Sequence, residues 1–107
     1  MRTPMTNEER DIRLRLDKSV TQIRRGLKRC PSVDELPYSD LDESDTIVAE
    51  VNDALHEALS CTESLEQLRL ASEDAVLIAS ASRTALGLVR EILTALSAKI
   101  DIQRAAA

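Results

Sequence analysis

Three side chains of this 107-residue chain are of a type that performs chemistry: His56, the only histidine, and the two cysteines, Cys30 and Cys61. His56 is followed by Glu57 and lies one helical turn from Asp53, and a histidine beside carboxylates can transfer protons or bind a metal. No second histidine or cysteine stands at ligand spacing from it, and the helical pattern described below places it opposite the apolar stripe. We therefore expect His56 to face solvent, and the sequence predicts no catalytic residue, no metal site and no cofactor.

The two cysteines continue apolar stripes of the predicted helices, a placement typical of small buried side chains. They are too few for a disulfide framework, and the pattern leaves open whether they come near each other. The chain also has no glycine-rich phosphate loop, no CxxC motif and no nucleophile elbow. We therefore expect that this protein is not an enzyme.

Charge is divided along the chain. Residues 1–30 carry nine basic and four acidic side chains, whereas residues 31–68 carry eleven acidic side chains and neither Lys nor Arg. The stretch RRGLKRC at residues 24–30 has the clustered charge that binds phosphates. However, the net charge is −5 and Tyr38 is the only aromatic residue, so aromatic side chains for base stacking are nearly absent. The basic and acidic segments most simply attract each other, and we expect no nucleic-acid partner.

Residues 7–29 are predicted to form a basic N-terminal helix. Thr6 and Glu9 have the spacing of a capping box, in which each side chain bonds a free backbone N–H at the helix start. Pro31 ends the helix, because the residue before a proline is disfavoured in helical geometry. Its apolar stripe, with steps of three or four residues, consists of Ile12, Leu16, Val20, Ile23, Leu27 and Cys30.

Residues 31–44 have no periodicity and read as an acidic linker. After the linker, apolar and small residues alternate in steps of four and three, the spacing of a helix that packs along another helix. This inner seam consists of Ile47, Val51, Ala54, Ala58, Cys61, Leu65, Leu68, Ser72, Ala75, Ala79, Ser82, Leu86, Val89, Leu93, Leu96 and Ile100.

Ser72 interrupts the inner seam with a residue suited to capping a helix, and Glu73 and Asp74 follow it where a helix dipole favours negative charge. We therefore predict a tight turn at about 71–73 between helices 45–70 and 73–103. The alternative is a single rod of about 59 residues and about 88 Å, which would need a partner to cover its apolar side chains.

The predicted fold is all-α: one domain over residues 1–107, in which the basic N-terminal helix packs on a long antiparallel hairpin with a coiled-coil-like seam. The third helix is the most apolar, and we expect it to be the most central of a three-helix bundle. The longest uncharged apolar run, residues 75–82, is too short to cross a membrane. The polar N-terminus does not resemble a secretory signal, so we expect a cytoplasmic protein without membrane contact.

These features predict a non-enzymatic interaction module, such as an adaptor, an assembly subunit or a small regulator. The third helix is too broadly apolar for one neighbour to bury, so the expected partner is a second copy or another helical protein. The candidate partner-binding residues are Leu88, Ile92, Leu96 and Ile102. The alternative function is a small regulator of nucleic-acid transactions, acting through the basic helix or through acidic imitation of nucleic acid.

Overall fold

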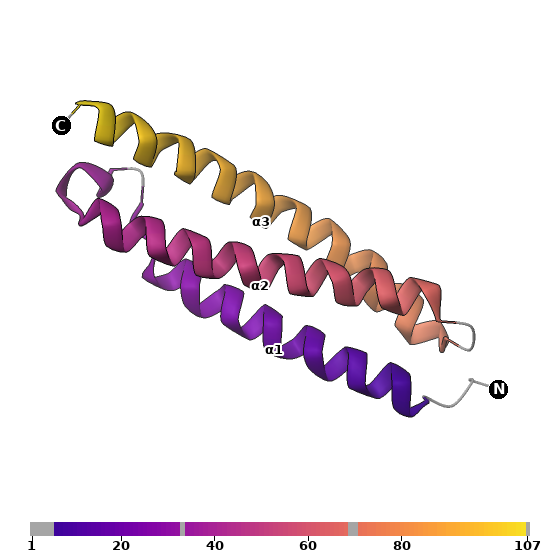
Figure 1. Ribbon diagram of the computed structural model, residues 1–107. Coiled ribbons are helices and arrows are strands. Elements are labelled where there is room, and N and C mark those ends of the chain that lie inside the picture. The colour runs from indigo at the N-terminus through magenta and orange to yellow at the C-terminus, as the bar shows by residue number, and fades with distance from the viewer. Residues whose placement is uncertain (1–5, 33, 69–70, 107) are drawn as a thin grey trace.

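The computed structural model describes residues 6–32, 34–68 and 71–106. The chain forms a three-helix bundle, about 60 Å long and 17 Å across, and the described residues contain no strand. The all-α bundle predicted from the sequence is confirmed, including the antiparallel helical hairpin (Figure 1). Its elements are α1 (Asn7–Arg29), the short 3₁₀ helix η1 (Leu36–Tyr38), α2 (Leu41–Gln67) and α3 (Glu73–Ala106).

The central helix is α2, and the prediction that the third helix is the most central is wrong. Helix α2 lies between α1 and α3 and packs closely along both (Figure 1). It buries two adjacent stripes, one of which includes the polar residues Ser44 and Thr62. Their hydroxyls donate to carbonyl oxygens of their own helix, Ser44 to Asp40 and Thr62 to Leu59, so both side chains can be buried without an unpaired polar group.

The first turn of α1 differs from a capping box in one respect. The Thr6 Oγ1 accepts the backbone N–H of Glu9 at 3.1 Å, as predicted. The Glu9 carboxylate, in contrast, is fully buried and accepts the backbone N–H of Ser72 at 2.8 Å. This hydrogen bond joins the start of α1 to the start of α3, across the end of the bundle where the hairpin turns.

Helix α2 begins four residues before the predicted residue 45, so the predicted linker over 31–44 is too long. The Asp40 side chain caps the helix by accepting the backbone N–H groups of Asp42 and Glu43. Within the shortened linker, Leu36 of η1 is almost completely buried, and η1 packs against α3. The linker is therefore partly ordered by the core.

The chain reverses between α2 and α3, which excludes the single rod in this structure. Helix α2 ends at Gln67, and α3 begins at Glu73. The Ser72 Oγ accepts the backbone N–H of Ala75 at 3.2 Å, which confirms Ser72 as the N-cap. Residues 69–70, at the predicted end of the second helix, lie outside the described part of the chain.

The core is aliphatic and follows the inner seam. Most of its residues in α2 and α3 are buried, among them Val51, Ala58, Leu65, Ala79 and Ile100. They form one cluster with the stripe of α1.

Ion pairs connect carboxylates of the acidic segment to arginines of α1 and of α3. Arg15 of α1 pairs with Glu57 at 2.6 Å, and Arg29 pairs with Glu50 at 3.4 Å. On the other side of α2, Arg83 and Arg104 of α3 also pair with α2 carboxylates. The predicted attraction between the segments is confirmed, although pairs this exposed contribute little stability each.

Candidate functional site

His56 is exposed on α2, as expected from its place opposite the inner seam. In residues 6–32, 34–68 and 71–106, no three His, Cys, Asp or Glu side chains are grouped so that they could hold a metal ion. His56 therefore belongs to no such group within those residues.

The two cysteines lie near opposite ends of the bundle and are both free thiols. Cys61 is completely buried beside Arg15 and Glu57, and its Sγ donates to Glu57 at 3.9 Å. Cys30 follows α1, fifteen residues after Arg15, or about 22 Å along the helix. This separation excludes a disulfide between them, which settles the question that the sequence left open.

The environment of both thiols opposes ionisation. Burial raises the pKa of Cys30, and the nearby Arg29 opposes that shift in part. Burial also raises the pKa of Cys61; Arg15 lowers it, and Glu57 raises it further. A raised pKa leaves less thiolate at neutral pH, so neither thiol is activated as a nucleophile.

Alkylation should distinguish the two thiols. With iodoacetamide at pH 7, we expect Cys30 to react more slowly than a free thiol and Cys61 to stay unmodified until the protein is unfolded in denaturant. Modification of Cys30 should accelerate as the pH is raised, because its thiolate fraction increases. Mass spectrometry of the digested protein measures both sites, and rapid labelling of Cys61 in the folded protein would contradict its described burial.

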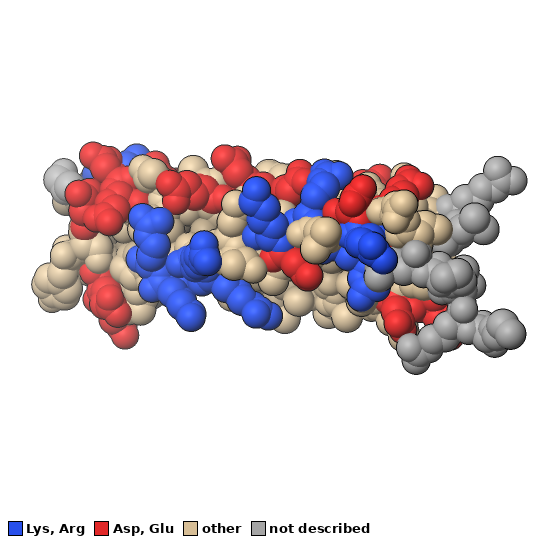
Figure 2. All heavy atoms as spheres, turned by 90° about the horizontal axis from the view of Figure 1, so that it is seen from below, with Lys and Arg blue, Asp and Glu red and all other residues tan. Residues whose placement is uncertain are grey.

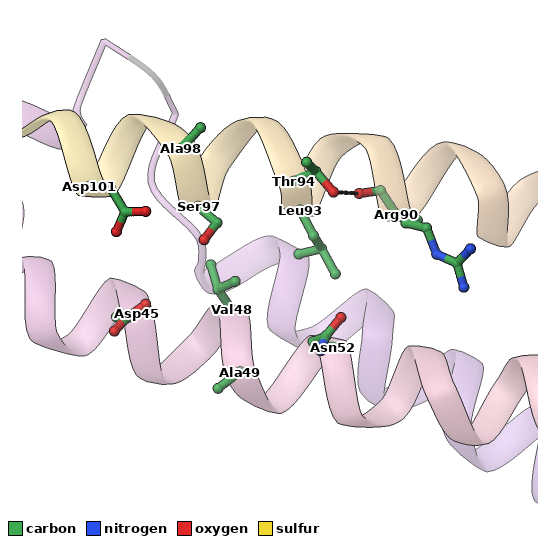
Figure 3. Close-up of a pocket in the computed structure, with 10 residues that line it drawn as sticks. All are labelled: Asp45, Val48, Ala49, Asn52, Arg90, Leu93, Thr94, Ser97, Ala98 and Asp101. Atoms are coloured by element: carbon green, nitrogen blue, oxygen red, sulfur yellow. Dashed lines mark hydrogen bonds between the residues drawn. The ribbon is translucent and has the colours of Figure 1, made fainter.

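A shallow hollow of about 510 Å³ lies between α2 and α3 (Figure 3). Val48 and Leu93 are its apolar residues of largest size, and Asp45 and Asp101 lie at one end with Arg90 towards the other. Asp45 is paired with Arg104 at 3.4 Å. Of the two hydroxyls that line it, the Thr94 hydroxyl donates to the carbonyl oxygen of Arg90 at 2.9 Å.

The most prominent surface feature is a second apolar stripe on α3, which we call the outer seam. Its members alternate in steps of three and four, and each except Ile102 stands one position before a member of the inner seam. The outer seam consists of Ile78, Ala81, Ala85, Leu88, Ile92, Ala95, Lys99 and Ile102. Lys99 is its only charged member, so the stripe is apolar over residues 78–95.

The outer seam contains three of the four predicted partner-binding residues. Leu88, Ile92 and Ile102 are 59%, 53% and 59% exposed. Leu96 belongs to the inner seam, is 7% exposed and packs in the core. It is therefore covered by this chain itself, and we do not include it in the candidate surface.

A hollow of about 350 Å³ between α1 and α3 borders the outer seam. Ala81 and Ala85 of the outer seam line it, together with residues of the inner seam. From α1, the apolar side chains of Val20 and Leu27 line it, with Arg24 beside them. Because α1 and α3 both pack mainly on α2, this side of the bundle is left open.

The chain matches none of the protein families, curated proteins or solved structures with which it was compared. Within the part of the chain that the structure describes, none of the helices combines the length and apolar character needed to cross a lipid bilayer.

The sequence contained a signal for the outer seam. Its three-and-four spacing from Ile78 to Ile102 is as regular as that of the inner seam. The predicted partner-binding residues include Leu88, Ile92 and Ile102 of this stripe but not the alanines between them, because alanine gives a weak hydropathy signal. Which of the two stripes is exposed depends on which helix is central, and that required the structure.

A basic surface lies on α1 (Figure 2). Lys and Arg gather over the middle of the face seen there, and Asp and Glu lie beside them, especially towards the end that contains the linker. Arg24, Arg25 and Lys28 are exposed, while Arg15 and Arg29 form ion pairs with α2. Part of the basic charge of α1 is thus neutralised within the chain.

Proposed function

We propose that this protein is a non-enzymatic interaction module that binds helical protein surfaces, either of a second copy or of another protein, through the outer seam of α3. The observation that supports the proposal most directly is the exposure of Leu88, Ile92 and Ile102 along one regular stripe. Scattered apolar side chains are normal on a protein surface, whereas a contiguous apolar stripe is typical of an interface.

The shape of this surface favours a helix as the bound element. Steps of three and four residues keep the outer seam on one side of α3, the arrangement by which one helix packs along another. The hollow between α1 and α3 adds the apolar side chains of Val20 and Leu27 beside that seam. An amphipathic helix laid along α3 would cover both.

The substitution Ile92→Glu tests the proposal. Ile92 is 53% exposed, so the change should leave the fold of the single chain almost unchanged. At an interface it would bury a carboxylate without a partner, and we expect at least a 100-fold loss of affinity, corresponding to several kcal/mol. Sedimentation measures self-association, and affinity purification with mass spectrometry identifies any other partner and reports whether the variant still binds it.

Ser80→Glu is the matched control. Ser80 is exposed on the same helix but lies outside both seams, so a carboxylate there should not affect binding. If the unmodified protein sediments as a monomer and no identified partner is lost by Ile92→Glu, the proposed function is wrong.

The second candidate function, regulation of nucleic-acid transactions, is supported by the exposed side chains of Arg24, Arg25 and Lys28 on α1. Binding through these residues would be electrostatic and would weaken steeply with added salt. A gel shift at low salt that disappears when all three are changed to Gln would favour nucleic-acid binding through α1, and the absence of any shift at low salt would exclude it.

A further inference from the structure

We propose that the occupant of the outer seam is a second copy of this chain, packed antiparallel along α3 with the two-fold axis between Ala85 and Leu88. This inference rests on the proposed function and names the partner for it. The order of residue sizes and charges along the outer seam supports this arrangement.

Large and small side chains of the outer seam are arranged so that two antiparallel copies fit together. When two identical helices pack antiparallel about this axis, residues at the same level have numbers that add to 173. Each outer-seam pair over residues 78–95 then joins one large and one small side chain: Ile78 with Ala95, Ile92 with Ala81, and Leu88 with Ala85. Such pairing fills the space between helices evenly and permits close approach.

The same axis also places Lys99, the charged member of the outer seam, beside an opposite charge. Lys99 falls at the level of Asp74 of the second copy, so opposite charges meet, whereas Ile102 extends beyond the first residue of the second copy's α3, Glu73. In an antiparallel coiled coil, a seam residue that is followed by a step of three packs against one that is followed by a step of four. All the pairs given by this axis over residues 78–95 meet that requirement.

Parallel packing of two copies fits the outer seam less well. Each residue would then meet its own counterpart, so Ala81, Ala85 and Ala95 would form layers with too little volume to fill the contact. Lys99 would face Lys99 of the second copy, which places like charges together. Antiparallel packing avoids both costs.

The geometry of α3 permits this contact along most of its length. The outer seam spans 25 residues, and its two ends lie about 36 Å apart along the helix. Ile102 is exposed in the single chain, and Ile78 is half-buried because it packs partly against the core. Helices packed this way lie about 8–10 Å apart. The second α3 would also cover the edge of the hollow that Ala81 and Ala85 line.

Disulfide cross-linking between single-cysteine variants tests the axis and the direction. The background carries Cys30→Ser and Cys61→Ala, and its circular dichroism spectrum and sedimentation are first shown to match those of the unmodified protein. Ile78→Cys and Ala95→Cys are then made as two separate proteins. In the proposed dimer residue 78 of one copy lies beside residue 95 of the other, whereas two copies of residue 78 lie about 26 Å apart along the helix axis.

We expect a covalent dimer when the two variants are mixed and oxidised, and at least tenfold less when either is oxidised alone. Efficient cross-linking of each variant alone would indicate parallel packing and would overturn the proposal, as would the absence of cross-linking in the mixture. Adding Ile92→Glu to both variants should abolish the cross-link, since random collisions in solution would not respond to that change.

Sedimentation and binding measurements on the unmodified protein distinguish a failure of this inference from a failure of the proposed function. A dimer in sedimentation that Ile92→Glu converts to a monomer supports both. A monomer that binds an identified helical protein through Ile92 overturns the inference and leaves the proposed function in place. A monomer for which Ile92→Glu affects no binding overturns both.

Discussion

Replacing Gly26 by alanine is expected to destabilise the protein by about 2 kcal/mol, although alanine is the better helix former. A Cβ atom added at Gly26 would overlap Cγ2 of Val51, which is 1% exposed and held in the core of α2. Valine is stiff about χ1, so its methyl group cannot turn aside, and α1 must move away from α2. Over-packing of this kind costs about 1–3 kcal/mol, and an overlap this deep with a stiff side chain belongs at the upper end of that range. Subtracting the gain of about 1 kcal/mol in helix propensity leaves a net loss of about 2 kcal/mol.

Gly87→Ala is the control for this prediction. Gly87 also lies inside a helix, but nothing lies within 4 Å of a Cβ atom added there. The same chemical change should therefore stabilise the protein by about 1 kcal/mol, through helix propensity alone. Urea unfolding of the two variants measures both effects, and their opposite signs are the expected result.

A second substitution shows whether the predicted clash is the cause. Val51→Ala alone should cost about 2 kcal/mol, because it leaves a cavity. Combined with Gly26→Ala, it removes the methyl group in the way and lets the new Cβ fill part of that cavity. The double variant should then lose about 1 kcal/mol less unfolding free energy than the two single variants lose in sum. Simple additivity would contradict a direct contact between the two residues.

The close approach at Gly26 illustrates what periodicity predicts and what it leaves out. The stripe of α1 and the inner seam were recognisable because core positions repeat every three or four residues in any helix that packs along another. Gly26 has no side chain and therefore no hydropathy signal, yet it is buried at the contact between α1 and α2. The value of a glycine at this position depends on the distance between two backbones, which the sequence does not display.

The prediction that the third helix is the most central was wrong for a related reason. Apolar content favoured the third helix, but the additional large side chains of α3, such as Leu88 and Ile92, are on its surface. Helix α2 is central although its second stripe includes Ser44 and Thr62, because their hydroxyls bond to their own backbone. Hydropathy counts such residues as polar, whereas a bonded hydroxyl can be buried at little cost.

The start of α2 was predictable in principle. Asp40, followed by Asp42 and Glu43, has the residue types of a helix start, with a capping side chain and acids in the first turn. The same acids made residues 31–44 look like a uniform linker without periodicity. Local capping chemistry was therefore a better guide to this boundary than the onset of the apolar pattern.

Removal of the Glu9 carboxylate is expected to have the largest effect on the end of the bundle where the hairpin turns. Glu9 is completely buried, and its Oε1 accepts the backbone N–H of Ser72 at 2.8 Å, just before α3 begins. Its Oε2 lies 3.7 Å from Nη1 of Arg13. Glu9→Ala would leave a buried N–H without its acceptor, and a hydrogen bond to a charged group contributes about 1.5–3 kcal/mol.

Glu8→Ala is the matched control for Glu9→Ala, because both residues are acids in the first turn of α1 and Glu8 is exposed. Both changes remove the same favourable interaction with the helix dipole, so the difference between them reports the contacts that only the buried Glu9 makes, with Ser72 and with Arg13. We expect Glu9→Ala to be less stable than Glu8→Ala by about 2 kcal/mol in urea unfolding, and Glu9→Gln, which keeps an acceptor oxygen without the charge, to lie between them. Hydrogen exchange of the Ser72 amide supplies the local measurement: it should accelerate in Glu9→Ala and stay unchanged in Glu8→Ala. Equal stability of the two alanine variants, with equal exchange at Ser72, would show that the buried carboxylate does not join α1 to α3.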